Sequence, residues 1–133
     1  MKIVTLRDEL VPADGCVVIR GGAGTLEHDH VRGQAVENHD RYGFYGVSVF
    51  VTPPSAVADL FGDHPIGSRY DAKPVFVARA ATLLGAGFPL LPTGLPPHYD
   101  VVLPDVSERH LVRLRNCFDG PVIAPPEPLP PVR

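Results

Sequence analysis

Apolar runs of strand length alternate with polar, glycine-rich and proline-rich stretches along this 133-residue chain. Three runs, residues 16–20, 44–51 and 98–103, are rich in β-branched and aromatic residues and are bounded by glycine or proline. That pattern is typical of buried strands. Residues 75–80 have the same character, and residues 3–6 could form a short first strand. The pattern predicts one sheet with these segments as its strands.

Two or three helices are expected between and after the strands. The spacing of apolar residues is loosely helical over 25–40 and forms a clear stripe over 105–118. A helix is also expected after Thr52, because threonine is a good N-cap, and it should end at Gly62. Residues 82–88 should form a short turn or helix.

The C-terminal part of the chain is dominated by proline. Residues 121–133 contain six prolines, and residues 90–97 form a proline-rich connection. Such a composition favours extended, polyproline-like chain. The sequence therefore predicts a single compact α+β domain over residues 1–120, with a twisted, mostly antiparallel sheet, and a proline-rich extended tail over residues 121–133.

Composition limits the classes of function. The chain is 44% hydrophobic and 20% charged, which is typical of a globular domain, and its net charge of −3 gives no general attraction to nucleic acid. No run approaches the ~20 apolar residues that span a bilayer. The first residues lack the pattern of a signal peptide, so we expect a cytoplasmic protein with no membrane partner. Cys16 and Cys117 fit no metal or redox spacing and are expected to be buried thiols.

The histidines next to the first helix raise the question of a metal site. His28 and His30 form a His-x-His motif, which can grip a metal when it lies on a strand. On a helix, residues two apart diverge by about 200°, so the two rings cannot share one ion. We therefore expect no metal here and a solvated polar face instead.

Each of the three central strand runs has a polar residue at an edge or inside it: Arg20, Ser48 and His98. A polar residue in a buried strand is costly unless it is paired or used. We therefore expect these three side chains to line one cleft, with Arg20 and His98 within side-chain reach. Glycines 21 and 22 follow Arg20 and allow a ligand to approach the backbone, while a guanidinium matches phosphate oxygens in pairs.

The order of these motifs is similar to that of small bacterial ADP-ribosyltransferase-like and RES-type toxins. Arg20-Gly21-Gly22 ends an early strand, and the glycine- and aromatic-rich segment from Tyr42 to Thr52 carries Ser48 before a helix that contains Ala56. The resemblance covers about residues 16–104 by order of elements. It implies a toxin-like effector that acts on NAD, by ADP-ribosyl transfer or NAD hydrolysis.

The resemblance also implies roles for individual residues. Arg20 with Gly21 and Gly22 would hold the NAD pyrophosphate or ribose. Ser48 would support the nicotinamide-ribose pocket, and Tyr42 or Tyr45 would stack on the nicotinamide. NAD would then be the substrate, and a small antitoxin is a possible partner.

The catalytic residue of that family has no direct counterpart here. The family usually places a glutamate on a late strand, whereas Glu108 is expected in a helix. Asp100 or His98 would have to take its place on the strand at 98–103. The resemblance therefore supports ADP-ribosyl transfer less than it supports NAD hydrolysis or NAD binding.

Two other functions remain open from the residues alone. A metal-independent endoribonuclease toxin could use His98 for proton transfer, Arg20 as the cation, and Tyr99 as the acid, with Ser48 as an extra donor. Arginines on the last helix would then contact RNA phosphates. A non-enzymatic binding or immunity protein is the third hypothesis.

The strand and helix patterns also predict the core. The residues expected to be largely buried are Val18, Val47, Val49, Phe76, Val101, Leu111 and Leu114.

Overall fold

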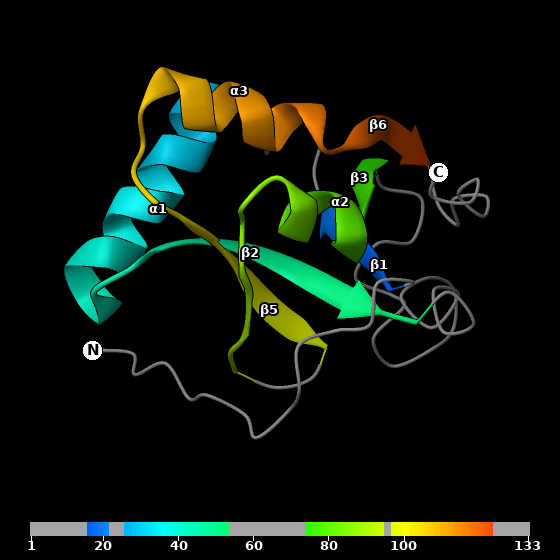
Figure 1. Ribbon diagram of the computed structural model, residues 1–133, viewed down its shortest axis with the longest axis horizontal. Coiled ribbons are helices and arrows are strands. Elements are labelled where there is room, and N and C mark those ends of the chain that lie inside the picture. Colours follow the sequence, from blue (N-terminus) through cyan, green and yellow to red (C-terminus); the bar gives the residue numbers. More distant parts are fainter. Residues whose placement is uncertain (1–15, 22–25, 54–73, 95–96, 124–133) are drawn as a thin grey trace.

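The computed structural model describes residues 16–21, 26–53, 74–94 and 97–123, and the account that follows concerns these residues. Six strands form one sheet in the order β4-β5-β2-β1-β3-β6, and every neighbouring pair is antiparallel (Figure 1). The strands are β1 (Val17–Gly21), β2 (Tyr45–Thr52), β3 (Pro74–Arg79), β4 (Leu90–Pro92), β5 (His98–Leu103) and β6 (Asp119–Ile123). The helices are α1 (His28–Tyr42), α2 (Ala80–Gly85) and α3 (Glu108–Asn116). The predicted α+β fold with an antiparallel sheet is confirmed.

Alternation along the strands separates the sheet into two faces. Val47 and Val49 of β2 lie in the main apolar cluster, which also takes in Tyr99 and Val101 of β5. Successive side chains of a strand point to opposite faces, so Ser48 and Asp100 point away from this cluster. We call the side that holds the cluster the helix face and the other side the Ser48 face.

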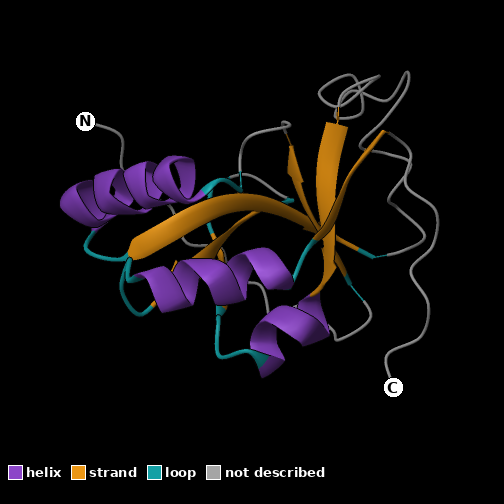
Figure 2. Ribbon diagram, turned by 90° about the horizontal axis from the view of Figure 1, so that it is seen from above, coloured by secondary structure: helices purple, strands orange, loops and turns teal. Residues whose placement is uncertain are grey.

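All three helices add side chains to the same cluster. Val31 and Ala35 come from α1, Leu83 from α2, and Leu111 and Leu114 from α3. Seen from above, α3 lies between α1 and α2 (Figure 2). None of the helices in the described ranges is long and apolar enough to cross a membrane.

The ends of the first helix differ from the expectation. The sequence predicted a helix over 25–40, and α1 runs from His28 to Tyr42. It ends because Gly43 adopts a left-handed conformation with φ of 87°, and its N–H bonds to the carbonyl of His39. This is the usual C-terminal cap that glycine provides.

Two strands were missed because they contain proline. β4 lies within the expected proline-rich connection and pairs with β5. β6 includes Pro121 to Ile123, the first three residues of the expected tail, and pairs with β3. Both strands stand at the edges of the sheet, where a residue without an N–H is tolerated. The expectation that residues 121–123 form extended chain outside the sheet is therefore wrong.

Some expected elements lie outside the described residues. These are the short strand at 3–6, the helix after Thr52, and the tail beyond residue 123. The strands predicted at 16–20, 44–51, 75–80 and 98–103 agree with β1, β2, β3 and β5 to within one residue.

The two cysteines are free thiols packed against the edge of the core. Each is only partly buried, which is less than the sequence predicted. Burial raises the pKa of the Cys117 thiol, and its Sγ donates a hydrogen bond to the carbonyl of Arg113 at 3.3 Å. A thiol whose pKa is raised stays protonated and is a poor nucleophile.

All seven predicted core residues are buried. Phe76 on β3 is 3% exposed, and the guanidinium carbon of Arg115 stands 5.0 Å from its ring centroid. The ring thus contributes both apolar burial and a cation–π contact.

We expect Phe76→Ala to lower the free energy of unfolding by about 3–5 kcal/mol, the usual cost of truncating a buried phenylalanine. The measurement is urea denaturation followed by circular dichroism. Val112→Ala is the control, because Val112 on α3 is 41% exposed and its truncation should change stability by less than about 0.5 kcal/mol. Equal unfolding midpoints for the two variants would contradict the assignment of Phe76 to the core.

Candidate active site

A serine and a histidine contact each other on the Ser48 face of the sheet. Ser48 lies in the middle of β2, and His98 begins β5. Ser48 Oγ is 2.6 Å from His98 Nε2, and both side chains are partly exposed. The register brings them together: Ser48 stands opposite Asp100 and Phe50 opposite His98, so Ser48 and His98 are diagonal neighbours on one face.

The second ring nitrogen of His98 is also engaged. His98 Nδ1 lies 2.9 Å from the hydroxyl of Thr93 and 3.1 Å from the carbonyl oxygen of Thr93. Thr93 directly follows β4, and the edge of the His98 ring faces the Phe50 ring at a centroid distance of 6.0 Å. The imidazole is therefore held in place on both nitrogens.

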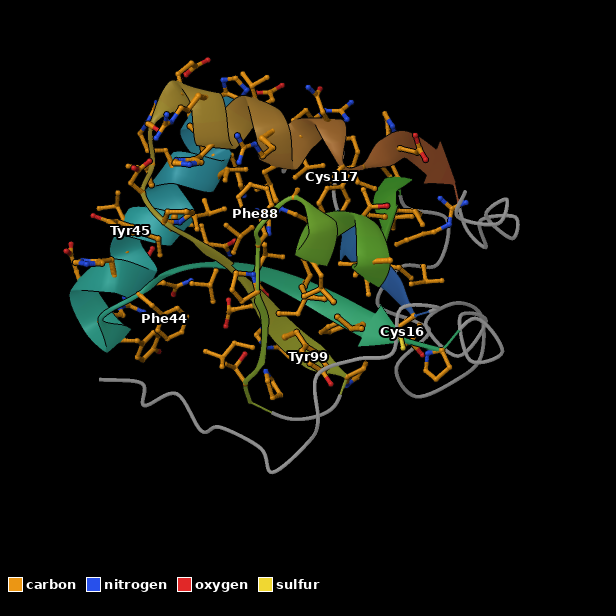
Figure 3. All side chains as sticks on the ribbon, in the orientation of Figure 1. Cys16, Phe44, Tyr45, Phe88, Tyr99 and Cys117 are labelled. Carbon is orange, nitrogen blue, oxygen red and sulfur yellow. The ribbon has the colours of Figure 1, made fainter. Side chains whose placement is uncertain are left out.

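Asp100 lies behind this pair. Its carboxylate is 5% exposed and accepts a hydrogen bond from Thr93 Oγ1 at 2.8 Å. Gly46 leaves room beside it, because a Cβ at this position would stand 3.1 Å from Asp100 Oδ1 and 2.6 Å from Phe44 Cε2. The rings of Phe44 and Tyr45 lie on opposite sides of the start of β2 (Figure 3).

Arg20 contacts the same strand from the helix face. Its Nη1 donates to the carbonyl oxygen of Ser48 at 2.7 Å and to Gln34 Oε1 at 2.9 Å. Gln34 Oε1 also accepts the N–H of Ser48 at 3.0 Å. Because the β1–β2 pairing ends at Ile19 and Phe50, these two side chains replace β1 as the backbone partners of Ser48.

The expected single cleft is therefore wrong with respect to Arg20. Arg20 shares the side of β1 that Val18 presents to the core, and it is 4% exposed. Ser48 and His98 point to the other face. Arg20 and His98 share Ser48 as a partner, but they reach it from opposite sides of the sheet.

The residues expected to bind NAD do not come together around Ser48 Oγ. Tyr45 points to the helix face and stacks on His39 at a ring distance of 4.2 Å. Tyr42 ends α1 and stacks near Phe44 at 6.4 Å. Gly21 is the last residue of β1, and Gly22 lies outside the described residues.

Of the remaining acidic and histidine candidates, Glu108 and His28 pair between α1 and α3. Glu108 begins α3 and pairs with His28 at 2.6 Å and with Arg32 at 3.4 Å. It is therefore on a helix, as predicted, and not on a strand. His30 lies in the first turn of α1 with its side chain exposed. Within the described ranges, no group of three or more histidine, cysteine, aspartate or glutamate residues is arranged to hold a metal ion.

A second serine–histidine–aspartate cluster lies where α3 begins. Ser107 Oγ and Asp105 Oδ1 lie 2.9 and 2.6 Å from the same nitrogen, His110 Nδ1. The N–H of Ser107 also donates to Asp105 at 2.9 Å. A single nitrogen cannot donate to the carboxylate and also accept the serine proton, so this cluster is not arranged to activate Ser107. Its hydrogen bonds connect Asp105, Ser107 and His110 at the start of α3.

The cluster around Ser48 differs in its use of the two ring nitrogens. Ser48 contacts Nε2 of His98, whereas Thr93 contacts Nδ1. A proton held on Nδ1 leaves Nε2 free to accept the hydroxyl proton of Ser48. This is the arrangement in which a histidine activates a serine nucleophile.

Comparisons of the chain with protein-family models, with curated proteins and with solved structures gave no match.

Sequence reasoning found Ser48, His98 and Asp100 but missed Thr93 and Gln34. Thr93 lies in a segment whose prolines predicted only a connection. Gln34 lies on a helix of weak amphipathic pattern, where a glutamine is normally solvated. Neither position carries a local signal, because each acts through a strand that is distant in the sequence.

We expect Gln34→Leu to lower the free energy of unfolding by about 1–3 kcal/mol, since the Ser48 N–H and Arg20 both lose an acceptor. Gln34→Glu keeps an acceptor oxygen at the same position and should be no less stable than the wild type. Urea denaturation of both variants is the measurement. A glutamate variant as unstable as the leucine variant would contradict this role for Oε1.

We also expect the free energy of unfolding to fall at acidic pH, and part of this fall to depend on Asp105. Hydrogen bonds from the Ser107 side chain, from His110 and from the Ser107 N–H hold the pKa of Asp105 well below its ordinary range. The stabilisation is therefore complete above about pH 3.9, the pKa in the unfolded chain, and it is lost as the pH falls toward the folded value.

Asp105→Asn should thus have a lower urea midpoint than the wild type at pH 7, and the gap should narrow at pH 3. Asp40→Asn, at an exposed position of α1, is the control and should leave both midpoints unchanged. A gap that stays constant between the two pH values would contradict the assignment.

Proposed function

We propose that the protein is a hydrolase in which Ser48 is the nucleophile and His98 the general base. The observation that carries the proposal is the 2.6 Å contact between Ser48 Oγ and His98 Nε2, with Nδ1 held separately by Thr93. A nucleophile in contact with a base that a third group orients is the signature of activated serine. Both side chains are partly exposed, so a substrate can reach them.

The reaction that suits this pair is hydrolysis of an acyl ester or a related carbonyl compound. The hydroxyl proton of Ser48 passes to His98 Nε2 as Oγ bonds to the carbonyl carbon. The imidazolium then gives this proton to the leaving oxygen as the acyl bond breaks. A water molecule then gives a proton to the same nitrogen as its oxygen bonds to the acyl carbon. The bond between Oγ and the acyl carbon breaks, and the imidazolium returns the proton to Ser48 Oγ.

The NAD-consuming toxin and the ribonuclease hypotheses remain predictions, and they receive less support from the geometry. Both assign Arg20 to phosphate groups. Its Nη1 instead contacts Gln34 and the Ser48 carbonyl, and only 4% of the residue is exposed. A guanidinium that supports the backbone of the nucleophile is not available to bind a substrate pyrophosphate from solution.

We expect a fluorophosphonate probe to label the wild-type protein at Ser48. The serine oxygen bonds to phosphorus, fluoride leaves, and the proton passes to His98. Intact-protein mass spectrometry measures the labelling rate. Ser48→Ala should abolish it, and His98→Gln should slow it about 10²–10⁴-fold, the usual contribution of a positioned base.

Ser107→Ala is the matched control, because Ser107 also contacts a histidine but through the shared nitrogen. It should be labelled at the wild-type rate. A wild-type protein that is not labelled, or a Ser48→Ala variant labelled equally fast, would refute the proposal. In that case consumption of NAD and of RNA by the wild type and by His98→Gln decides between the two toxin hypotheses and a binding protein.

A further inference from the structure

Beyond the contact between Ser48 and His98, we propose that Thr93 and Asp100 are positioning residues that fix the proton of His98 on Nδ1. This inference rests on the proposed function for its catalytic meaning, but the position of the proton can be measured without any activity. The proposal explains why a carboxylate and a hydroxyl are buried within the sheet, at 5% and 2% exposure.

The direction of the hydrogen bonds follows from Asp100. Thr93 Oγ1 donates to Asp100 Oδ2 at 2.8 Å. A hydroxyl has one proton, so Thr93 Oγ1 can then only accept from His98 Nδ1, which lies 2.9 Å away. The carbonyl of Thr93, 3.1 Å from the same nitrogen, is also only an acceptor. Both contacts therefore place the proton on Nδ1.

A proton on Nδ1 determines the state of the other nitrogen. Neutral His98 then has a lone pair on Nε2, and the Ser48 hydroxyl donates to it across 2.6 Å. When Nε2 takes the serine proton, the bonds from Nδ1 to Thr93 and from Thr93 to Asp100 keep their direction. These two hydrogen bonds therefore need no rearrangement during proton transfer, and the negative charge of Asp100 favours the imidazolium that forms.

The sheet places these groups in a fixed order. Asp100 is opposite Ser48 on β2 and opposite Leu91 on β4. Thr93 follows β4, and its N–H donates to the carbonyl of His98 at 3.3 Å. Nucleophile, base and carboxylate thus come from β2 and β5, and the hydroxyl that joins the last two comes from the edge of the sheet.

The first test measures the tautomer of His98 in the wild-type protein from the nitrogen chemical shifts of ¹⁵N-labelled histidine. His98→Gln identifies the signals by their loss. We expect the proton on Nδ1 at a pH where the ring is neutral. A wild-type ring that carries its proton on Nε2 would overturn the proposal whether or not the protein is an enzyme.

The second test uses the rate of fluorophosphonate labelling. Thr93→Val removes the hydroxyl but keeps the shape, and Asp100→Asn removes the charge. We expect each to slow labelling by about 10–10³-fold, less than the about 10⁴-fold lost where a carboxylate contacts the histidine directly. Thr93→Ser restores the hydroxyl and should recover most of the rate.

Two controls separate positioning from general stability. Asp105→Asn alters the other aspartate that is linked to a histidine, and it should not change the rate. Urea midpoints identify any variant that is partly unfolded. If Thr93→Ser and Thr93→Val were folded and were labelled equally slowly, the proposed role of the Thr93 hydroxyl would be wrong. If no form were labelled at all, the proposed hydrolase would fail, and the tautomer measurement alone would decide this inference.

Discussion

The backbone of β2 needs hydrogen-bond partners on both sides, and β1 supplies them along only part of its length. Pairing between the two strands ends at Ile19 and Phe50. Beyond that point, Arg20 donates to the C=O of Ser48, Gln34 accepts from its N–H, and Asn38 donates to the carbonyl of Gly46 at 2.7 Å. Buried backbone groups cannot be left without partners, so these three side chains allow β2 to continue as a strand and to present Ser48 at a fixed position.

This arrangement also gives Arg20 its function in the fold. A buried guanidinium is costly unless its donors have acceptors, and here Nη1 of Arg20 bonds to a backbone carbonyl and to a glutamine, which offsets part of that cost. The residue that the sequence marked as a ligand contact instead supports the strand that carries Ser48, the proposed nucleophile. The Ser48 side chain lies on one face of β2, and the Arg20 and Gln34 side chains that bond to its backbone come from the other face.

The sequence predicted the fold better than the site. β1, β2, β3 and β5 were predictable because β-branched runs such as Val17 to Ile19 have a strong local pattern. β4 and β6 were not, since Pro92 and Pro121 are tolerated only because both strands are at an edge, which is a property of the sheet. For the site, a polar residue inside an apolar strand indicated Ser48 and His98, which the structure brings into contact. The side to which Arg20 points depends on register, which the sequence did not provide.

The position of Thr93 has a consequence for how the protein would lose its chemistry. β4 has three residues and pairs with only one neighbour, so little holds it compared with the central strands. Proteins open locally, and short edge strands such as β4 open at a lower free energy than the core. Detachment of β4 would remove the Thr93 partners of His98 Nδ1 while β1, β2 and β3 stay paired. Heat or denaturant should therefore disrupt the proposed site in a separate and reversible step that precedes global unfolding.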